Sequence, residues 1–162
     1  MSNFNQYKFI SAHPNCEVKI NLSTDQKGLF ATSSFKKGDI IIDFGSSKIV
    51  DLPNYLTVQI SEHKHIHLSP EYLQYINHSC SPNVLFNTSS MQLECLTNVA
   101  IGDELFFFYP ATEWKMSQVF NCHCGSASCV GLIQGASLLP MDIIQNYKLT
   151  DFIALMLQKK NS

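Results

Sequence analysis

The alternation of apolar and polar residues predicts short β-strands along most of the chain. Residues 16–23, CEVKINLS, place Cys16, Val18 and Ile20 on one side and polar residues between them, which is the period-two pattern of a half-buried strand. We expect an edge strand or one arm of a hairpin here. Residues 27–45 contain two β-rich runs separated by the turn signal KKGD, which predicts that these two runs pair with each other.

The remaining pattern predicts a mostly β (α+β) fold with C-terminal helices. Apolar residues at helical spacing are concentrated in residues 139–158, where Asp142 and then Thr150 or Asp151 are candidate N-caps. A short helical turn is expected within PEYLQYI, residues 70–76. A turn at VAIGDE separates the last two predicted strands. Further strands are expected at residues 55–60, 65–68, 83–87, 91–97 and 104–109.

Length and composition indicate one compact domain with an appendage. The chain has 162 residues, of which 45% are hydrophobic, enough to bury a single core. The composition changes after Tyr109, which marks the appendage. The chain opens with no pattern typical of a signal peptide, and its longest apolar runs, such as ELFFFY, are too short to cross a bilayer. We expect an intracellular protein, cytoplasmic or, in a eukaryote, nuclear, with no membrane partner.

Charge narrows the choice of partners. All eleven basic residues are lysine, so no arginine offers forked phosphate contacts, and nucleic acid is not an expected partner. Between residues 38 and 113, nine acidic residues face two lysines, a net charge of −7, which would attract a cationic ligand. The apolar C-terminal helix is a candidate surface for a homodimer.

Cysteine is concentrated near the C-terminal end. In CHCGSASC, Cys122, Cys124 and Cys129 fall at positions i, i+2 and i+7, close enough to hold one metal ion. In an intracellular chain this spacing favours metal binding over disulfides or ordinary buried thiols. A tetrahedral site needs a fourth ligand. The candidates for it are His123, Cys95, Cys16, Cys80 and a water molecule.

A second histidine-rich segment is a weaker metal candidate. In HKHIH, alternation places His63, His65 and His67 on one face of a strand. No carboxylate or thiol stands nearby at ligand spacing. We therefore interpret this run as a polar strand face.

Four segments, in order, resemble the SET-domain protein-lysine methyltransferases, which transfer a methyl group from S-adenosylmethionine to lysine. KGLFATSSFKKGDIII resembles the glycine motif, YINHSCSPN the central signature, GDELFFFY the catalytic-tyrosine strand and CHCGSASCVG the cysteine-rich post-SET tail. The resemblance implies a β-clip-like fold of several small sheets with a pseudoknot, an exception to unthreaded connections. It also implies that the pseudoknot brings NHSC against ELFFFY.

The same resemblance implies a division of the chain and a set of site residues. A SET domain is expected over residues 1–110, a zinc-binding post-SET segment over residues 111–135 and a C-terminal helical extension over residues 136–162. Tyr109 is the expected catalytic residue, and a single structural zinc ion is the expected metal. The zinc ligands would be Cys80, Cys122, Cys124 and Cys129. The residues in contact with S-adenosylmethionine would be Lys27, Gly28, Leu29, Phe30, Asn77, His78, Tyr109 and His123.

The expected partner is a lysine-containing protein or peptide. Free lysine, with a pKa near ~10.4, is almost fully protonated at neutral pH, whereas methyl transfer needs a neutral amine, in-line approach and little water. The sulfonium charge and partial burial lower the pKa of that amine, which reduces the need for a dedicated strong base. Phe107 and Tyr75 are expected to line the substrate channel. A phenylalanine at position 107 leaves room for an amine that is already methylated.

Three positions depart from the family pattern. Gln26, Gln74 and Phe108 stand where the family has glycine, arginine and aspartate respectively. Only a short stretch separates DFGSS from the central signature, which leaves little room for the insert that shapes a peptide groove. Two alternatives therefore stay open: a methyltransferase for a small-molecule amine, and a catalytically silent zinc-bearing interaction module.

Overall fold

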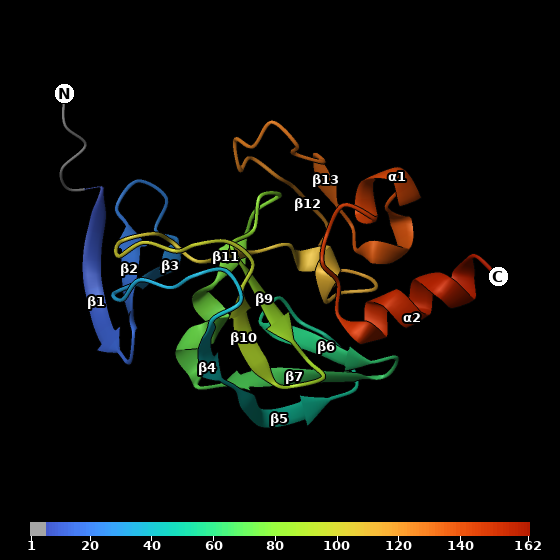
Figure 1. Cartoon of the computed structure of the whole chain (residues 1–162), viewed down its shortest axis with the longest axis horizontal. Helices are drawn as coiled ribbons and strands as arrows, with labels where there is room; N and C mark the ends of the chain where they lie inside the picture. The colour runs from blue at the N-terminus through green and yellow to red at the C-terminus, as the bar shows by residue number, and fades with distance from the viewer. Residues whose placement is uncertain (1–5) are drawn as a thin grey trace.

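The computed structural model describes residues 6–162, so the first five residues of the predicted 1–110 region lie outside the described residues. It confirms the mostly β (α+β) fold of small sheets with C-terminal helices (Figure 1). The helical elements are η1 (Glu71–Tyr75), η2 (Tyr109–Ala111), η3 (Ala136–Leu138), α1 (Met141–Ile144) and α2 (Asp151–Lys160). The strands are β1 (Tyr7–His13), β2 (Cys16–Asn21), β3 (Lys27–Ala31), β4 (Ile40–Asp43), β5 (Gly45–Val50), β6 (Thr57–Ser61), β7 (Lys64–Ser69), β8 (Asn77–His78), β9 (Val84–Asn87), β10 (Gln92–Cys95), β11 (Phe106–Phe107), β12 (Phe120–Asn121) and β13 (Leu132–Ile133).

The N-terminal sheet has the order β1-β2-β3 and lies at one end of the molecule (Figure 1). As predicted, β2 is one arm of a hairpin, formed with β1. The prediction of an edge position for β2 was wrong, because β3 pairs with its other side. The pattern did not reveal β1, since most of its residues are exposed and carry no burial signal.

The predicted hairpin within residues 27–45 was also wrong. A turn does form at KKGD, with the Asp39 amide donating to the Lys36 carbonyl oxygen at 2.9 Å. This turn carries the chain from one sheet into another: β3 joins β2, whereas β4 pairs with β10. The strands predicted at residues 91–97 and 104–109, on either side of VAIGDE, also lie in different sheets. Strand β10 pairs with β9, whereas β11 pairs with β8.

The central signature and the tyrosine strand lie side by side, as the resemblance implied. Strands β8 and β11 are parallel, with Asn77 opposite Phe106 and His78 opposite Phe107. The Asn83 side chain extends this pairing, because it accepts from the Phe106 amide at 2.8 Å and donates to the Glu104 carbonyl oxygen at 2.9 Å. Residues far apart in the sequence thus meet in one place.

The C-terminal helices lie at the end of the molecule opposite β1 (Figure 1). The Thr150 hydroxyl accepts from the Ile153 amide at 3.3 Å, which confirms Thr150 as the N-cap of α2. Asp142 is not a cap, because Pro140 holds the N-cap position of α1. Ile144 and Ile153 pack into a small core of their own. Among residues 6–162 we find no helix with the length and apolar character that a membrane span requires.

Gly135 is a position where neighbouring backbone leaves no room for a side chain. It has φ 109° and ψ 168°, and a methyl group there would lie 2.6 Å from the Trp114 carbonyl oxygen and 2.8 Å from the Lys115 Cα. We expect Gly135→Ala to lower the free energy of unfolding by at least about 2 kcal/mol in urea titrations, since both strain and overlap act. Gly45→Ala, at a site with open space, should change it by less than about 0.5 kcal/mol. Equal unfolding midpoints for the two variants would contradict this account.

Candidate active site

An open cleft lies where the sequence motifs converge. Its cavity volume is about 550 Å³, and its walls include Asn77 and His78 from β8, Tyr109 after β11, and His123 from the cysteine-rich tail. The resemblance assigned all four to cofactor contacts. The arrangement depends on the β8–β11 pairing, which aligns the signature with the tyrosine strand.

A polar network forms one wall of this cleft. The Asn77 amide group donates to the Lys27 carbonyl oxygen at 2.8 Å and to Glu104 Oε1 at 3.2 Å, while the Gln26 side chain donates to Asn77 Oδ1 at 3.2 Å. Burial raises the pKa of the Glu104 carboxyl, and the bond from Asn77 opposes that rise. A methyl group on Gly28 would lie 2.4 Å from Glu104 Oε1. A side chain at position 28 would therefore displace the Glu104 carboxylate from its place beside Asn77.

Leu29 and Phe30 do not line this cleft. Both side chains are buried, and the Leu29 carbonyl oxygen already accepts from the Leu105 amide at 2.8 Å. The structure thus brings the backbone of Lys27 and Gly28 to Asn77 and directs the next two side chains inward. Two wall residues that sequence reasoning missed are Glu104 and Phe120.

His78 and Tyr109 both line the cleft and are joined by a hydrogen bond. The Tyr109 amide donates to His78 Nδ1 at 3.1 Å, so the imidazole proton resides on Nε2, which lies 3.4 Å from Cys80 Sγ. Burial lowers the pKa of His78 to about 4. Burial, and then the nearby Glu113 carboxylate, raise the pKa of Tyr109 to about 12. At neutral pH the tyrosine hydroxyl is therefore a neutral hydrogen-bonding group beside a neutral imidazole.

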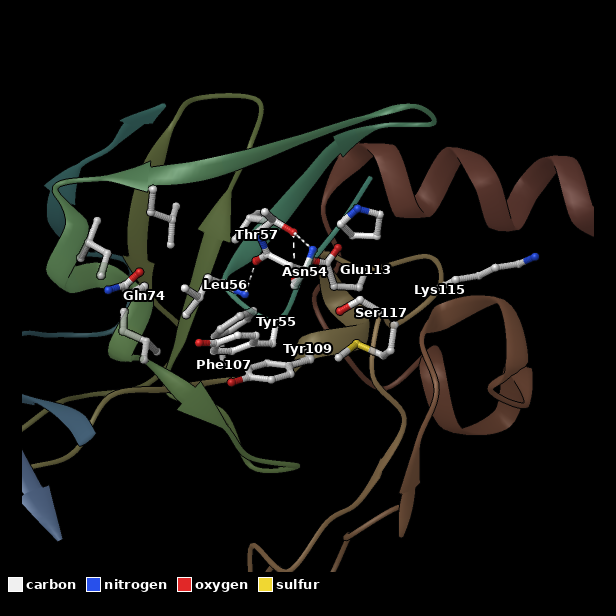
Figure 2. Close-up of a pocket in the computed structure, with 16 residues that line it drawn as sticks. Asn54, Tyr55, Leu56, Thr57, Gln74, Phe107, Tyr109, Glu113, Lys115 and Ser117 are labelled. Carbon is white, nitrogen blue, oxygen red and sulfur yellow. Dashed lines mark hydrogen bonds between the residues drawn. The ribbon is translucent and has the colours of Figure 1, made fainter. Parts of the chain in front are cut away.

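Tyr109 also borders a second cavity, which we call the slot (Figure 2). Its volume is about 30 Å³, much smaller than that of the open cleft. Phe107 and Tyr109 line the slot, and their ring centroids are 4.6 Å apart. Tyr75 lies instead in an adjoining groove, with Lys27 Nζ 5.0 Å above its ring. Tyr109 borders all three openings.

Glu113 is an acidic residue in the slot that sequence reasoning missed. It is only 8% exposed, and its Oε2 accepts from the Gln59 amide at 3.2 Å. The Trp114 amide donates in return to Gln59 Oε1 at 2.9 Å. Burial raises the pKa of Glu113 to about 8, against the hydrogen bond from Gln59. A single glutamate after the tyrosine strand gave no signal in the sequence, because only its burial distinguishes it.

The cysteine cluster has the geometry of a zinc site. The sulfur atoms of Cys80, Cys122, Cys124 and Cys129 all lie within 4.8 Å of one another, and those of Cys80 and Cys122 are 3.8 Å apart. Zinc–sulfur bonds of about 2.3 Å in a tetrahedron separate the sulfurs by about 3.8 Å. The four thiols therefore fit a closed structural zinc ion.

The geometry also selects among the candidates for the fourth ligand. Cys16 and Cys95 are buried in a different core cluster from Cys80, and His123 lines the open cleft. The four-cysteine group is the one cluster of three or more potential metal ligands that residues 6–162 contain. The HKHIH segment contributes no residue to it: His65 and His67 lie on β7, whereas His63 lies in the turn before that strand, so the three histidines do not share one strand face as expected.

The structure explains why a phenylalanine is accommodated at position 108. The Phe108 ring stacks on that of Tyr147, with centroids 3.7 Å apart and planes 7° apart. Phe108 also belongs to a buried cluster with Leu85 and Ile133, where an aspartate would be buried among apolar groups at a cost in stability. Tyr147 in turn donates to the Cys80 carbonyl oxygen at 2.8 Å. The C-terminal extension thus supports both the tyrosine strand and the cysteine cluster.

Comparison with known proteins agrees with this geometry. The sequence profile of the SET domain matches residues 26–110, just over half of the chain, and the chain therefore belongs to the SET domain family. Methyltransferases of this family use S-adenosylmethionine.

Two curated relatives illustrate the range of the similarity. The chain is 40% identical over 108 residues to methyltransferase flvH of Aspergillus flavus, an alignment that covers 65% of this chain and 60% of that protein. It is 33% identical over 58 residues to histone-lysine N-methyltransferase set9 of Schizosaccharomyces pombe, covering 35% of this chain and 12% of that protein. The chain therefore spans only part of the length of either relative.

The cysteine cluster predicts a defined zinc content. Protein purified without chelator should contain one zinc ion per chain by metal analysis. Replacing a ligand in Cys129→Ser should weaken zinc binding at least about tenfold, whereas Cys95→Ala, in the separate core, should retain one ion. Equal zinc content in wild type and Cys129→Ser after dialysis against a weak chelator would contradict the proposed ligand set.

Glu113 predicts a pH dependence of stability. Its pKa is raised from 4.5 to about 8 in the folded protein. Between these two pH values the unfolded chain has lost this proton while the folded protein still holds it, so rising pH favours unfolding. Between pH 5 and 8, wild type should lose stability relative to Glu113→Gln by up to about 1.4 kcal/mol per pH unit. Urea titrations of both proteins at each pH measure the difference. A constant difference across this range would show that the carboxyl titrates normally.

Proposed function

We propose that the protein is an S-adenosylmethionine-dependent N-methyltransferase that acts on the side-chain amine of lysine in a protein or peptide. The observation that carries this proposal is the position of Tyr109, which borders both an open cleft and a narrow slot. A methyl donor in the cleft and an amine in the slot would approach each other beside its hydroxyl. In-line approach of that kind is what transfer from a sulfonium to an amine requires.

The wall of the open cleft suits a ligand with an amino-acid end. The Glu104 carboxylate offers a partner for an ammonium group, and the Lys27 carbonyl oxygen and Asn77 amide lie within its network. Phe106, Phe120 and the tail residue His123 provide a flatter surface suited to an aromatic ring. When bound, S-adenosylmethionine supplies an electrophilic methyl group on a positively charged sulfur.

The residues around the slot would orient the amine and limit access of water. Phe107 and Tyr109 form aromatic walls that favour an alkylammonium group over bulk solvent. The neutral Tyr109 hydroxyl is available to hydrogen-bond the amine nitrogen. Phe107 carries no hydroxyl that would occupy the space of an added methyl group, so we propose that di- or trimethylation is possible, which the mass of the product would reveal.

Zinc would have a structural role in this scheme. Three of the four thiols lie on the segment between β12 and β13, and Cys122 and Cys124 also border the open cleft. An ion that fixes this segment would fix one wall of the cofactor site. We accordingly propose the division into a SET domain to residue 110, a zinc-binding segment over residues 111–135 and a helical extension over residues 136–162.

A small-molecule amine is the second candidate substrate. The chain between β5 and β8 contains only the β6–β7 hairpin and the short helix η1, which leaves little surface to hold an extended peptide. Labelled cofactor, offered separately to the protein and metabolite fractions of one extract, distinguishes the two substrates. Label confined to metabolites would contradict action on protein lysine.

Replacement of Tyr109 tests the reaction directly. With tritiated S-adenosylmethionine, Tyr109→Phe should reduce methyl transfer by at least about a hundredfold while its calorimetric affinity for the cofactor stays near that of wild type. Tyr72→Phe is the matched control, because the buried Tyr72 hydroxyl has no hydrogen-bond partner among the described residues. It should keep full activity. Absence of cofactor binding by the wild-type protein would refute the proposed function.

A further inference from the structure

The slot has an acidic wall as well as aromatic walls. Glu113 and Tyr109 are joined by one helical turn, because the Glu113 amide donates to the Tyr109 carbonyl oxygen at 3.0 Å. Both side chains line the same slot (Figure 2), and the Glu113 carboxylate is near enough to raise the pKa of Tyr109. The carboxyl group and the tyrosine ring therefore border the same cavity, where both could contact a bound ligand.

Glu113 lacks a cationic partner within the part of the chain that the structure describes. The two ion pairs there join Lys19 to Glu17 and Lys148 to Glu94. Lys115, the one lysine that lines the slot, is exposed. A buried carboxylate without a counter-ion destabilises a fold. Since its hydrogen bond from the Gln59 amide needs only a carbonyl oxygen, a glutamine would satisfy the structure equally well.

We propose that Glu113 binds the alkylammonium group of the substrate in this slot and accepts one of its protons, leaving a free amine beside Tyr109. The ammonium N–H bond breaks, its electron pair stays on nitrogen, and the proton passes to a carboxylate oxygen. In the transfer step, which rests on the proposed function, that pair forms the new N–C bond. The electrons of the breaking C–S bond remain on sulfur, so the sulfonium becomes a thioether.

The surroundings set the protonation of Glu113 before the amine binds. Burial raises its pKa to about 8, so most molecules carry the proton at pH 7 while the slot is free. The titratable groups around it are Tyr109 on its own turn, Tyr55 and Lys115 along the slot, and His65 on β7, opposite Gln59 of β6. An ammonium ion that enters the slot favours the ionised carboxylate. Binding at pH 7 should therefore release a proton to solvent.

Calorimetry with n-butylammonium tests this inference without methyl transfer. The zinc-loaded full chain is titrated at pH 7 in two buffers of different ionisation enthalpy, with and without S-adenosylhomocysteine. Wild type should release close to one proton per bound ammonium ion. Glu113→Gln should bind it at least about tenfold more weakly and release none, whereas Glu113→Asp, which restores the charge, should again release a proton. Glu17→Gln, which removes an acid outside the slot, should behave as wild type.

The neutral analogue n-butanol separates charge recognition from simple filling of the slot. It should bind wild type and Glu113→Gln equally weakly. Equal n-butylammonium affinity in those two proteins, no proton release by wild type, or no binding by wild type would each overturn the proposal. Thermal unfolding of each variant shows whether a loss of binding reflects a loss of fold. If Glu113→Gln does not fold, the proton release measured with Glu113→Asp tests the proposal in its place.

Two lysine probes distinguish the possible sources of the ammonium group. Nα-acetyl-lysine N-methylamide represents a lysine within a protein, and free lysine represents a small-molecule amine. Tighter binding of the first supports a protein substrate, and tighter binding of the second supports a metabolite. These titrations measure amine binding and not methyl transfer. A protein that binds the amine but not S-adenosylmethionine would therefore contradict the methyltransferase function and still support the role of Glu113.

Discussion

The parallel pairing of β8 with β11 holds together two segments that are distant in the sequence, and the candidate site depends on it. Two residues on each strand are in register, too few for a stable sheet on their own. Asn83 strengthens the pairing through two side-chain bonds to the backbone around β11. Because His78 accepts from the Tyr109 amide, the same junction positions the tyrosine between the open cleft and the slot.

The C-terminal part of the chain supports this junction from the other side. Tyr147 stacks on Phe108 and donates to the Cys80 carbonyl oxygen, so one residue contacts both the segment of the catalytic-tyrosine motif and the backbone of the first cysteine of the cluster. Cys80 lies two residues after the end of β8, and its sulfur lies 3.8 Å from that of Cys122 in the tail. The tail and the residues after it therefore contact the segments that form the cleft, and the four clustered thiols are suited to a zinc ion that would hold them together.

The predictable features were those with a strong local signal. The spacing of the tail cysteines predicted a cluster suited to a metal ion, and the structure brings these thiols together. The ordered motifs indicated the family and the β-rich fold, and apolar spacing predicted the C-terminal helices, including the Thr150 cap. Strand pairing was less predictable. The KKGD turn formed, yet the strands beside it joined different sheets, because pairing partners are chosen by contacts with distant strands. The two-residue strands β8 and β12 are too short to produce a periodic pattern.

By itself the sequence determined which chemical groups are present: six thiols of which three are closely spaced, a tyrosine after an aromatic run, and an asparagine–histidine pair. Only the tertiary structure decided which of them meet. Cys80 rather than Cys16 or Cys95 joins the tail because the chain places the other two in a separate core. Glu113 became a candidate because burial, not residue type, changes the proton affinity of a carboxyl group. Burial is a property of the surroundings, which the local sequence does not contain.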